Sequence, residues 1–185
     1  PLRPEAASVL HQLHKLGIRN TVMMTGDSYR TAEAIAKQVG VDQFYAEVLP
    51  EDKANFVQKE KAAGHTVVMI GDGINDSPAL SAADIGIAIN SGAAIAREIA
   101  DVTIKADSLE ELVFLKTVAN ALQHRVSANY RFVLSFNSTL ILLGALGILQ
   151  PAASAMLHNL STLGISLKSM TNLVQTPSSL PQIAK

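Results

Sequence analysis

Residues 71 to 80 read GDGINDSPAL and place two aspartates, Asp72 and Asp76, four positions apart directly after the apolar run TVVMI. Carboxylate oxygens suit Mg²⁺, which proteins usually hold through one or two carboxylates together with substrate phosphates. Asn75 lies between the acids and can donate to a phosphoryl oxygen without adding negative charge. A turn explains the glycines but does not need both acids. The stretch therefore predicts a magnesium and phosphate site.

Two other polar segments could complete such a site. In the segment TGD, Thr25 supplies a hydroxyl, Gly26 permits a close backbone approach, and Asp27 adds a third carboxylate. Lys53 offers a point positive charge that suits a phosphate or a phosphorylated carboxylate. Alone, TGD could be a turn, Lys53 a solvated helix lysine and Asp76 a helix cap. Their joint occurrence favours a phosphoryl site.

The elements that must position these residues alternate between strands and helices. We expect strands at 18–24, 44–48, 66–70, 85–89 and 101–104, and helices at 31–40, 50–64, 77–83 and 93–100. Alternation of this kind predicts an α/β fold with an open, Rossmann-like parallel sheet, in which ligands collect at the carboxyl ends of the strands. All three polar segments follow predicted strands, so the fold should bring them to one edge.

The remainder of the chain differs in charge and pattern. Residues 1 to 111 carry ten basic and sixteen acidic side chains, whereas residues 112 to 185 carry five basic and no acidic ones. A long helix is predicted over 108–131, and residues 132 to 167 contain no charged side chain. This charge-free run divides at Gln150–Pro151 into two parts near the roughly 20 residues that cross a bilayer. We expect a transmembrane hairpin at 132–174, and a buried soluble hairpin is the alternative.

Polar residues inside this predicted hairpin are candidates for binding a transported ion. Asn137 lies in the first predicted span, and His158 and Thr162 share a helix face in the second. A neutral imidazole binds zinc, copper, iron or nickel. The alternative for the amide and hydroxyl groups is hydrogen bonding between helices. The chain has no cysteine, so thiolate ligands and disulfides are excluded within it.

Taken together, TGD, PEDK, GDGINDSPAL, the segment DVTI and the apolar hairpin resemble a P-type ATPase of the heavy-metal (type IB) subfamily. These pumps have a haloacid-dehalogenase-like phosphorylation domain. The resemblance implies the C-terminal portion of such a pump: the second half of the phosphorylation domain at 1–107, a linking helix at 108–131, the last two membrane helices at 132–174 and a cytoplasmic tail at 175–185. The basic residues at the hairpin ends favour a cytoplasmic α/β domain beneath a bacterial plasma membrane.

The resemblance also implies roles. Asp72 would bind the catalytic Mg²⁺, and Asp76 with Asn75 would organise that site. Lys53 would contact an aspartyl phosphate formed from ATP, and Thr25, Gly26 and Asp27 would line its pocket. Expected partners are ATP, a divalent transition metal, a lipid bilayer and the upstream domains of the pump, but not nucleic acid.

The chain lacks the DKTGT motif that carries the family's phosphorylated aspartate, so it cannot complete the cycle alone. Also missing are the nucleotide-binding domain, the TGE loop and the membrane cysteine motif. Two alternatives stay open: a soluble phosphatase of the same superfamily, and an inactive fragment with an interaction role. The transported metal is not specified by these motifs.

Overall fold

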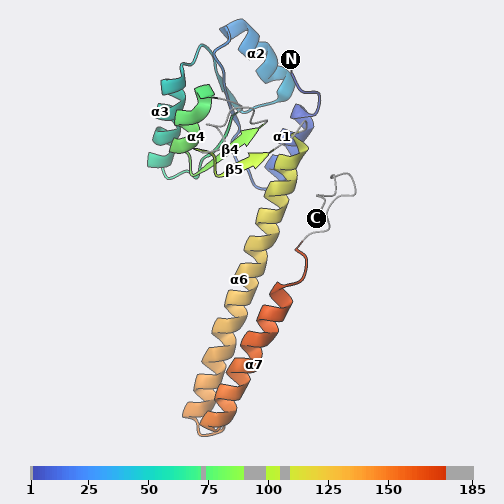
Figure 1. The fold of residues 1–185 in the computed structure, drawn as a ribbon, viewed down its shortest axis with the longest axis vertical. Helices are drawn as coiled ribbons and strands as arrows, with labels where there is room; N and C mark the ends of the chain where they lie inside the picture. The colour runs from blue at the N-terminus through green and yellow to red at the C-terminus, as the bar shows by residue number, and fades with distance from the viewer. Residues whose placement is uncertain (1, 72–73, 90–98, 105–108, 174–185) are drawn as a thin grey trace. The chain divides into compact units, whose positions relative to one another are not determined.

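The computed structural model describes residues 2–71, 74–89, 99–104 and 109–173, and the chain divides into two compact units, residues 1–114 and 115–185. The first unit is an α/β domain (Figure 1). Its elements are α1 (Ala6–Lys15), β1 (Val22–Met24), α2 (Tyr29–Val39), β2 (Gln43–Tyr45), α3 (Pro50–Ala62), β3 (Val68–Gly71), the 3₁₀ turn η1 (Ile74–Asp76), α4 (Ser77–Ala82), β4 (Ile85–Ile89) and β5 (Val102–Ile104). The predicted helix 93–100 falls mostly outside the described residues.

All strand pairings in the described part of the chain are parallel, as the alternating pattern predicts. They form a two-stranded sheet, β1–β2, and a three-stranded sheet in the order β3–β4–β5. The second predicted strand, 44–48, is shortened because Glu47 adopts a left-handed conformation with φ 56° and Val48 N–H donates back to the Thr25 carbonyl. The turn holds Ala46 to Val48 against the end of β1.

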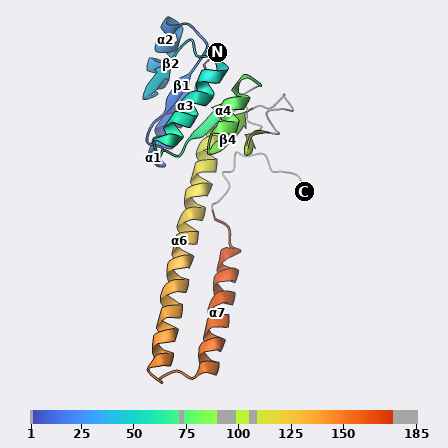
Figure 2. The same ribbon diagram turned by 90° about the vertical axis from the view of Figure 1, so that its left-hand side faces the viewer.

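Packing between α3, β3 and α4 forms one hydrophobic cluster in the core of this unit. Val57, Met69, Ala79 and Leu80 are buried together, with Met24 packed against them. Figure 2 shows α3 and α4 side by side. No helix was predicted over residues 6–15, although Ala6, Val9 and Leu13 of α1 are buried at helical spacing. That three- and four-residue spacing was the available signal for α1.

An aspartate precedes the later strand of each parallel pair and holds the earlier strand in register. Asp42 Oδ2 accepts the Thr21 N–H at 2.7 Å beside β1–β2. Asp84 Oδ2 accepts the Val67 N–H at 2.8 Å beside β3–β4, and Asp101 Oδ2 accepts the Gly86 N–H at 2.8 Å beside β4–β5. These contacts lie at the amino ends of the strands, opposite the edge that carries the candidate site.

The aspartate contacts predict acid sensitivity. The backbone N–H of Thr21 lowers the pKa of Asp42, and that of Val67 lowers the pKa of Asp84, from an ordinary value of 3.8. A folded-state pKa below the unfolded value contributes stability that is present above pH 3.8 and is lost as the pH falls through the folded-state pKa. Asp84→Asn should therefore flatten the pH dependence of unfolding, measured by urea titration from pH 2 to 6. An unchanged slope in this variant would contradict the assignment.

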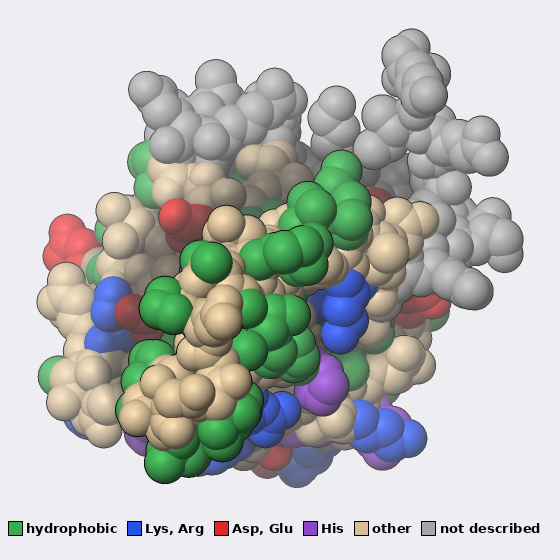
Figure 3. Space-filling model, turned by 90° about the horizontal axis from the view of Figure 1, so that it is seen from below, with side chains coloured by type: hydrophobic (Ala, Val, Ile, Leu, Met, Phe, Trp, Pro, Cys, Tyr) green, Lys and Arg blue, Asp and Glu red, His purple; other side chains and the backbone are tan. Residues whose placement is uncertain are grey.

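The second unit is a pair of helices. The long helix α6 (Glu110–Ala145) begins in the first unit and continues into the second, where α7 (Pro151–Ser169) follows. Arg125 of α6 donates through Nη1 to the Thr171 carbonyl at 2.6 Å and through Nη2 to the Asn172 carbonyl at 3.1 Å, which satisfies backbone groups just beyond α7. Many apolar side chains of this helix pair are exposed, including Ile141, Leu142 and Leu163. Figure 3 shows such side chains gathered on the face nearest the viewer.

The prediction of a transmembrane hairpin at 132–174 is wrong. None of the helices in the described ranges combines the length and the apolar character that a bilayer crossing needs. The apolar run at 132–149 is interrupted because α6 ends at Ala145, and the turns directly before the run carry Arg125, Asn129 and Arg131. The second helix carries His158, Asn159 and Lys168. The tail at 175–185 lies outside the described residues.

Candidate magnesium and phosphate site

Lys53 and Asp76, which are 23 positions apart in the sequence, form a direct ion pair. The Lys53 Nζ lies 2.8 Å from Asp76 Oδ1, and the two side chains are only 15% and 13% exposed. Pro50 begins α3 and so places Lys53 in its first turn, while Asp76 ends the 3₁₀ turn after β3. Partial burial weakens solvent screening, so this pair is a stronger electrostatic feature than a surface salt bridge.

Gly71, at the end of β3, leaves the space that Asp76 occupies. A Cβ atom at residue 71 would lie 2.6 Å from Asp76 Cβ and 2.9 Å from its Oδ2. Real Cβ atoms essentially never come this close to another heavy atom. The first glycine of GDGIND is therefore needed for the position of the aspartate, a reason that spacing alone did not reveal.

The TGD segment forms a tight turn after β1. Thr25 Oγ1 donates to Asp27 Oδ2 at 3.0 Å and accepts the Asp27 N–H at 3.1 Å. The Thr25 N–H donates to the Tyr45 carbonyl, and Glu47 N–H donates to the Asp27 carbonyl, each at 3.0 Å. The turn is thus fastened to residues 45–48, which lead directly into α3 and Lys53.

The other predicted residues of this site are placed as follows. Asn75 is exposed in η1, next to Asp76. Asp72, predicted to bind magnesium, lies outside the described residues. The hydroxyl of Ser77 is buried and has no hydrogen-bond partner in the part of the chain that the structure describes. From the sequence, Ser77 was considered only as a possible helix cap; in the structure Asp76 is the cap and Ser77 is the first residue of α4.

The three residues predicted to bind a transported metal are brought together in part. His158 Nδ1 lies 2.9 Å from Asn137 Oδ1, which joins α7 to α6. Thr162 Oγ1 instead donates to the His158 carbonyl at 3.0 Å within its own helix. Within the described ranges, no three His, Asp or Glu side chains converge to hold a metal ion.

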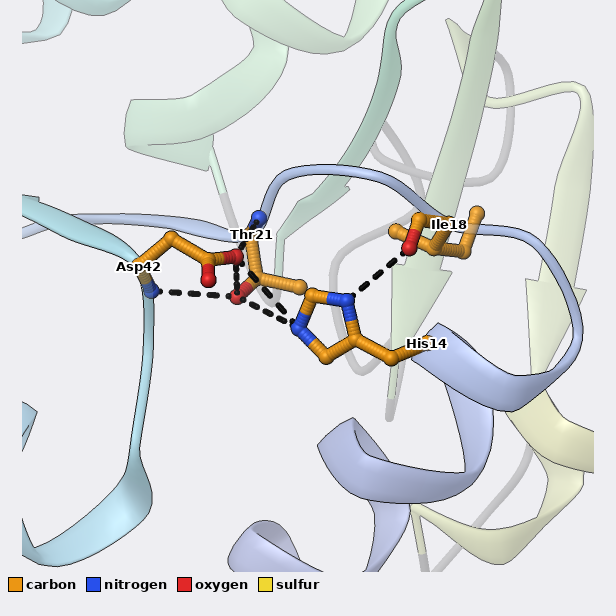
Figure 4. Close-up of polar contacts among 4 residues, drawn as sticks. All are labelled: His14, Ile18, Thr21 and Asp42. Atoms are coloured by element: carbon orange, nitrogen blue, oxygen red, sulfur yellow. Dashed lines mark hydrogen bonds and ion pairs between the residues drawn. The ribbon is translucent and has the colours of Figure 1, made fainter.

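A second polar cluster, not singled out in the sequence, lies at the amino ends of β1 and β2 (Figure 4). His14 Nε2 faces Asp42 Oδ2 at 3.3 Å and Thr21 Oγ1 at 3.4 Å, while Nδ1 faces the Ile18 carbonyl at 2.9 Å. A hydrolytic triad needs the aspartate on the histidine nitrogen that faces away from the hydroxyl. Here Thr21 Oγ1 donates directly to Asp42 at 2.8 Å. The cluster joins α1 to the strand pair, and its geometry does not activate the Thr21 hydroxyl as a nucleophile.

The chain is similar to proteins of known families. The haloacid dehalogenase-like hydrolases match residues 1–84. A zinc-exporting P-type ATPase of Mycobacterium marinum is 42% identical over 165 residues, covering 89% of this chain and 22% of that protein. A manganese-exporting P-type ATPase of Mycobacterium leprae is 41% identical over 165 residues, covering 89% of this chain and 23% of that protein.

A solved structure gives the same result. The crystal structure of a zinc-transporting PIB-type ATPase in the E2.Pi state matches with a TM-score of 0.83 and 34% identity, over 92% of this chain and 28% of that one. The chain spans about a quarter of the length of these relatives. Over 89% of its length the chain is similar to heavy-metal P-type ATPases, and its first unit has a haloacid dehalogenase-like α/β fold.

Proposed function

We propose that this chain supplies the magnesium and phosphate site of an ATP-driven heavy-metal pump that cycles through an aspartyl phosphate. The observation that carries the proposal is the largely buried ion pair between Lys53 and Asp76, which come from the PEDK and GDGIND segments. The similarity to metal-exporting ATPases over 89% of the chain supports it. We assign residues 1–107 to the second half of the phosphorylation domain and residues 108–131 to the linking helix.

The residues of this edge fit a magnesium ion. Asp76 Oδ1 accepts from Lys53, which leaves Oδ2 available to a cation or to a water molecule in its shell. The buried, unpartnered hydroxyl of Ser77 is the kind of group that a bound ligand or an ordered water satisfies. Asp72 would add the second carboxylate. A magnesium ion bound here would neutralise phosphoryl oxygens during transfer.

The residues of the chain itself then have distinct tasks. Lys53 donates to the acyl phosphate that forms on an aspartate outside this chain, and Asp76 fixes the lysine amine in position. The Thr25 and Asp27 N–H groups already donate to the Tyr45 carbonyl and to the Thr25 hydroxyl, so the turn presents the Gly26 N–H to the same phosphate. Asn75 donates to this phosphate from η1. Such positioning and charge neutralisation account for most of the catalysis of phosphoryl transfer.

The transported ion is a heavy-metal cation. The similar proteins export zinc or manganese, as their names state. If His158 Nδ1 donates its hydrogen to Asn137 Oδ1, Nε2 keeps a free lone pair for a metal, and the amide orients the ring. We propose His158 as a ligand of the transported ion, with Asn137 holding the ring in position and Thr162 as a weaker neighbour.

The proposal is tested by ATP hydrolysis of the full-length protein that contains this chain. We expect hydrolysis that requires Mg²⁺ and is stimulated by zinc, manganese or copper ions. Equal hydrolysis with and without each of these metals would contradict the pump and favour a phosphatase of the same superfamily.

His158→Ala in the same protein tests the ion ligand. We expect metal-stimulated hydrolysis to fall by about tenfold and the preference among metals to change, because second-shell or ligand losses of this kind cost about 10- to 100-fold. His124→Ala, which removes an exposed histidine from α6, is the matched control. If stimulation and preference are the same in both variants and the wild type, His158 is not a ligand and its contact with Asn137 only joins two helices.

A further inference from the structure

A cavity separate from the Lys53–Asp76 pair opens at the carboxyl ends of β1 and β2. Its volume is about 220 Å³. Its walls are two aromatic rings, Tyr45 and Phe56, two aliphatic side chains, Met24 and Val48, and two carboxylates, Glu47 and Asp52. The two rings are packed at a centroid distance of 5.1 Å with a tilt of 54°.

The carboxylates of this cavity are not neutralised from within the described part of the chain. Neither Glu47 nor Asp52 takes part in an ion pair or side-chain hydrogen bond there, whereas the neighbouring Lys53 is committed to Asp76. Both acids are exposed. Tyr45 is also 42% exposed although it is aromatic. Two unpaired negative charges beside an open aromatic wall are complementary to a cation with an apolar stem.

The size of the cavity decides between kinds of occupant. Sites for cofactors and drug-sized ligands usually measure about 300–1,000 Å³. At about 220 Å³ this cavity is too small for a nucleotide but holds one long side chain. A guanidinium can stack on the aromatic rings and at the same time donate to a carboxylate, whereas an ammonium is a compact, strongly hydrated charge.

We propose that this cavity docks an arginine side chain presented by another polypeptide segment. Glu47 and Asp52 accept from the guanidinium, Tyr45 and Phe56 form the surface on which it stacks, and Met24 and Val48 contact its methylene stem. The docking would act on the candidate phosphate site, because Glu47 N–H and Val48 N–H donate to the carbonyls of Asp27 and Thr25, each at 3.0 Å. This last step rests on the proposed function, but the docking itself does not.

The backbone of Glu47 connects the proposed docking site to the TGD turn. Glu47 has a φ of 56°, a conformation that non-glycine residues seldom adopt and that surrounding contacts must maintain. Its hydrogen bond to Asp27 is one such contact. A ligand that holds the Glu47 side chain therefore stabilises the same short segment that fastens the turn at Thr25.

The test uses the 185-residue chain and a small probe. We would titrate N-acetyl-arginine-N-methylamide into the ¹⁵N-labelled chain and follow the backbone amides of Ala46, Glu47 and Val48 by NMR. N-acetyl-citrulline-N-methylamide, which has nearly the same shape without the charge, is the matched control probe. We expect saturable shifts at these amides with the arginine probe and much smaller ones with citrulline.

Two charge-neutralising variants locate the site. Glu47→Gln and Asp52→Asn should each weaken binding by about two- to fivefold, as expected for partly exposed charge pairs. Glu51→Gln removes the same charge one residue from Asp52, outside the cavity walls, and should bind as the wild type does. Equal shifts with both probes, no saturable shift at residues 46–48, or equal weakening in all three variants would each overturn the proposal.

The comparison of the two probes uses the unsubstituted chain, so it decides the question even where a variant fails to fold. None of these titrations contains ATP or magnesium. Their failure would leave the proposed pump function standing, and a failure of ATP hydrolysis would leave the docking site standing.

Discussion

Replacing Lys53 with methionine is expected to destabilise the first unit by about 3 kcal/mol, the lower end of the range for breaking a buried ion pair. The variant keeps the methylene stem but leaves the Asp76 carboxylate, which is 13% exposed, without its cation. In the full-length protein we expect ATP hydrolysis to fall by at least about 100-fold, because a positioned charge at the transferred phosphate is lost. Urea unfolding and steady-state hydrolysis measure the two effects.

Lys59→Met is the matched control, since it removes an exposed lysine from the same helix α3. It should change stability and hydrolysis little. Combining Lys53→Met with Asp76→Asn removes both charges and should recover most of the stability but none of the hydrolysis. Recovery of both stability and hydrolysis in the double variant would show that the pair serves the fold alone. Equal losses in the Lys53 and Lys59 variants would show that the pair has no special role.

Gly71→Ala is expected to have an effect of similar size for a steric reason. The added Cβ would meet Asp76 Cβ at 2.6 Å, so the aspartate or the end of β3 must move. Overpacking of this kind costs about 1–3 kcal/mol. Because displacement of Asp76 also displaces the partner of Lys53, ATP hydrolysis by the full-length protein should fall with stability. Urea unfolding measures the stability and steady-state ATP hydrolysis measures the activity, as for Lys53→Met.

Gly86→Ala separates the loss of stability from the loss of ATP hydrolysis. Its Cβ would lie 2.8 Å from the Leu80 carbonyl oxygen, a backbone contact away from Asp76. We expect Gly86→Ala to lower stability by a similar amount and to leave hydrolysis per folded molecule nearly unchanged. If Gly71→Ala also leaves that ratio unchanged, then Gly71 only accommodates the fold, and its place beside Asp76 has no catalytic consequence.

The parallel α/β fold could be predicted because its signals are local. Short apolar runs such as residues 66–70 and 85–89 indicate buried strands, and Pro50 and Gly40 mark where α3 begins and α2 ends. The shortening of β2 could not be predicted. It depends on the left-handed conformation of Glu47 and on its hydrogen bond to Asp27, twenty positions earlier. The register aspartates were missed for the same reason, since each acts across two strands.

The transmembrane hairpin predicted at 132–174 shows how composition alone can give a wrong prediction. A run without charged residues predicts a spanning segment only if one helix contains all of it. Here α6 ends at Ala145, within the run, and its preceding turns carry Arg125, Asn129 and Arg131. Composition could not reveal this helix end. For the candidate site, residue types named Lys53 and Asp76 separately, but only the folded chain shows them 2.8 Å apart.

The central claim is that Asp76 and Lys53 form the magnesium and phosphate site of a pump with an aspartyl-phosphate intermediate. Its most direct test is phosphorylation of the full-length protein by ATP labelled at the γ-phosphate, followed by acid quenching. We expect label that hydroxylamine removes, as an acyl phosphate requires, and at least about 100-fold less of it in Asp76→Asn than in the wild type or in Lys59→Met. Equal labelling of Asp76→Asn and the wild type, or no hydroxylamine-sensitive label in the wild type, would contradict the claim.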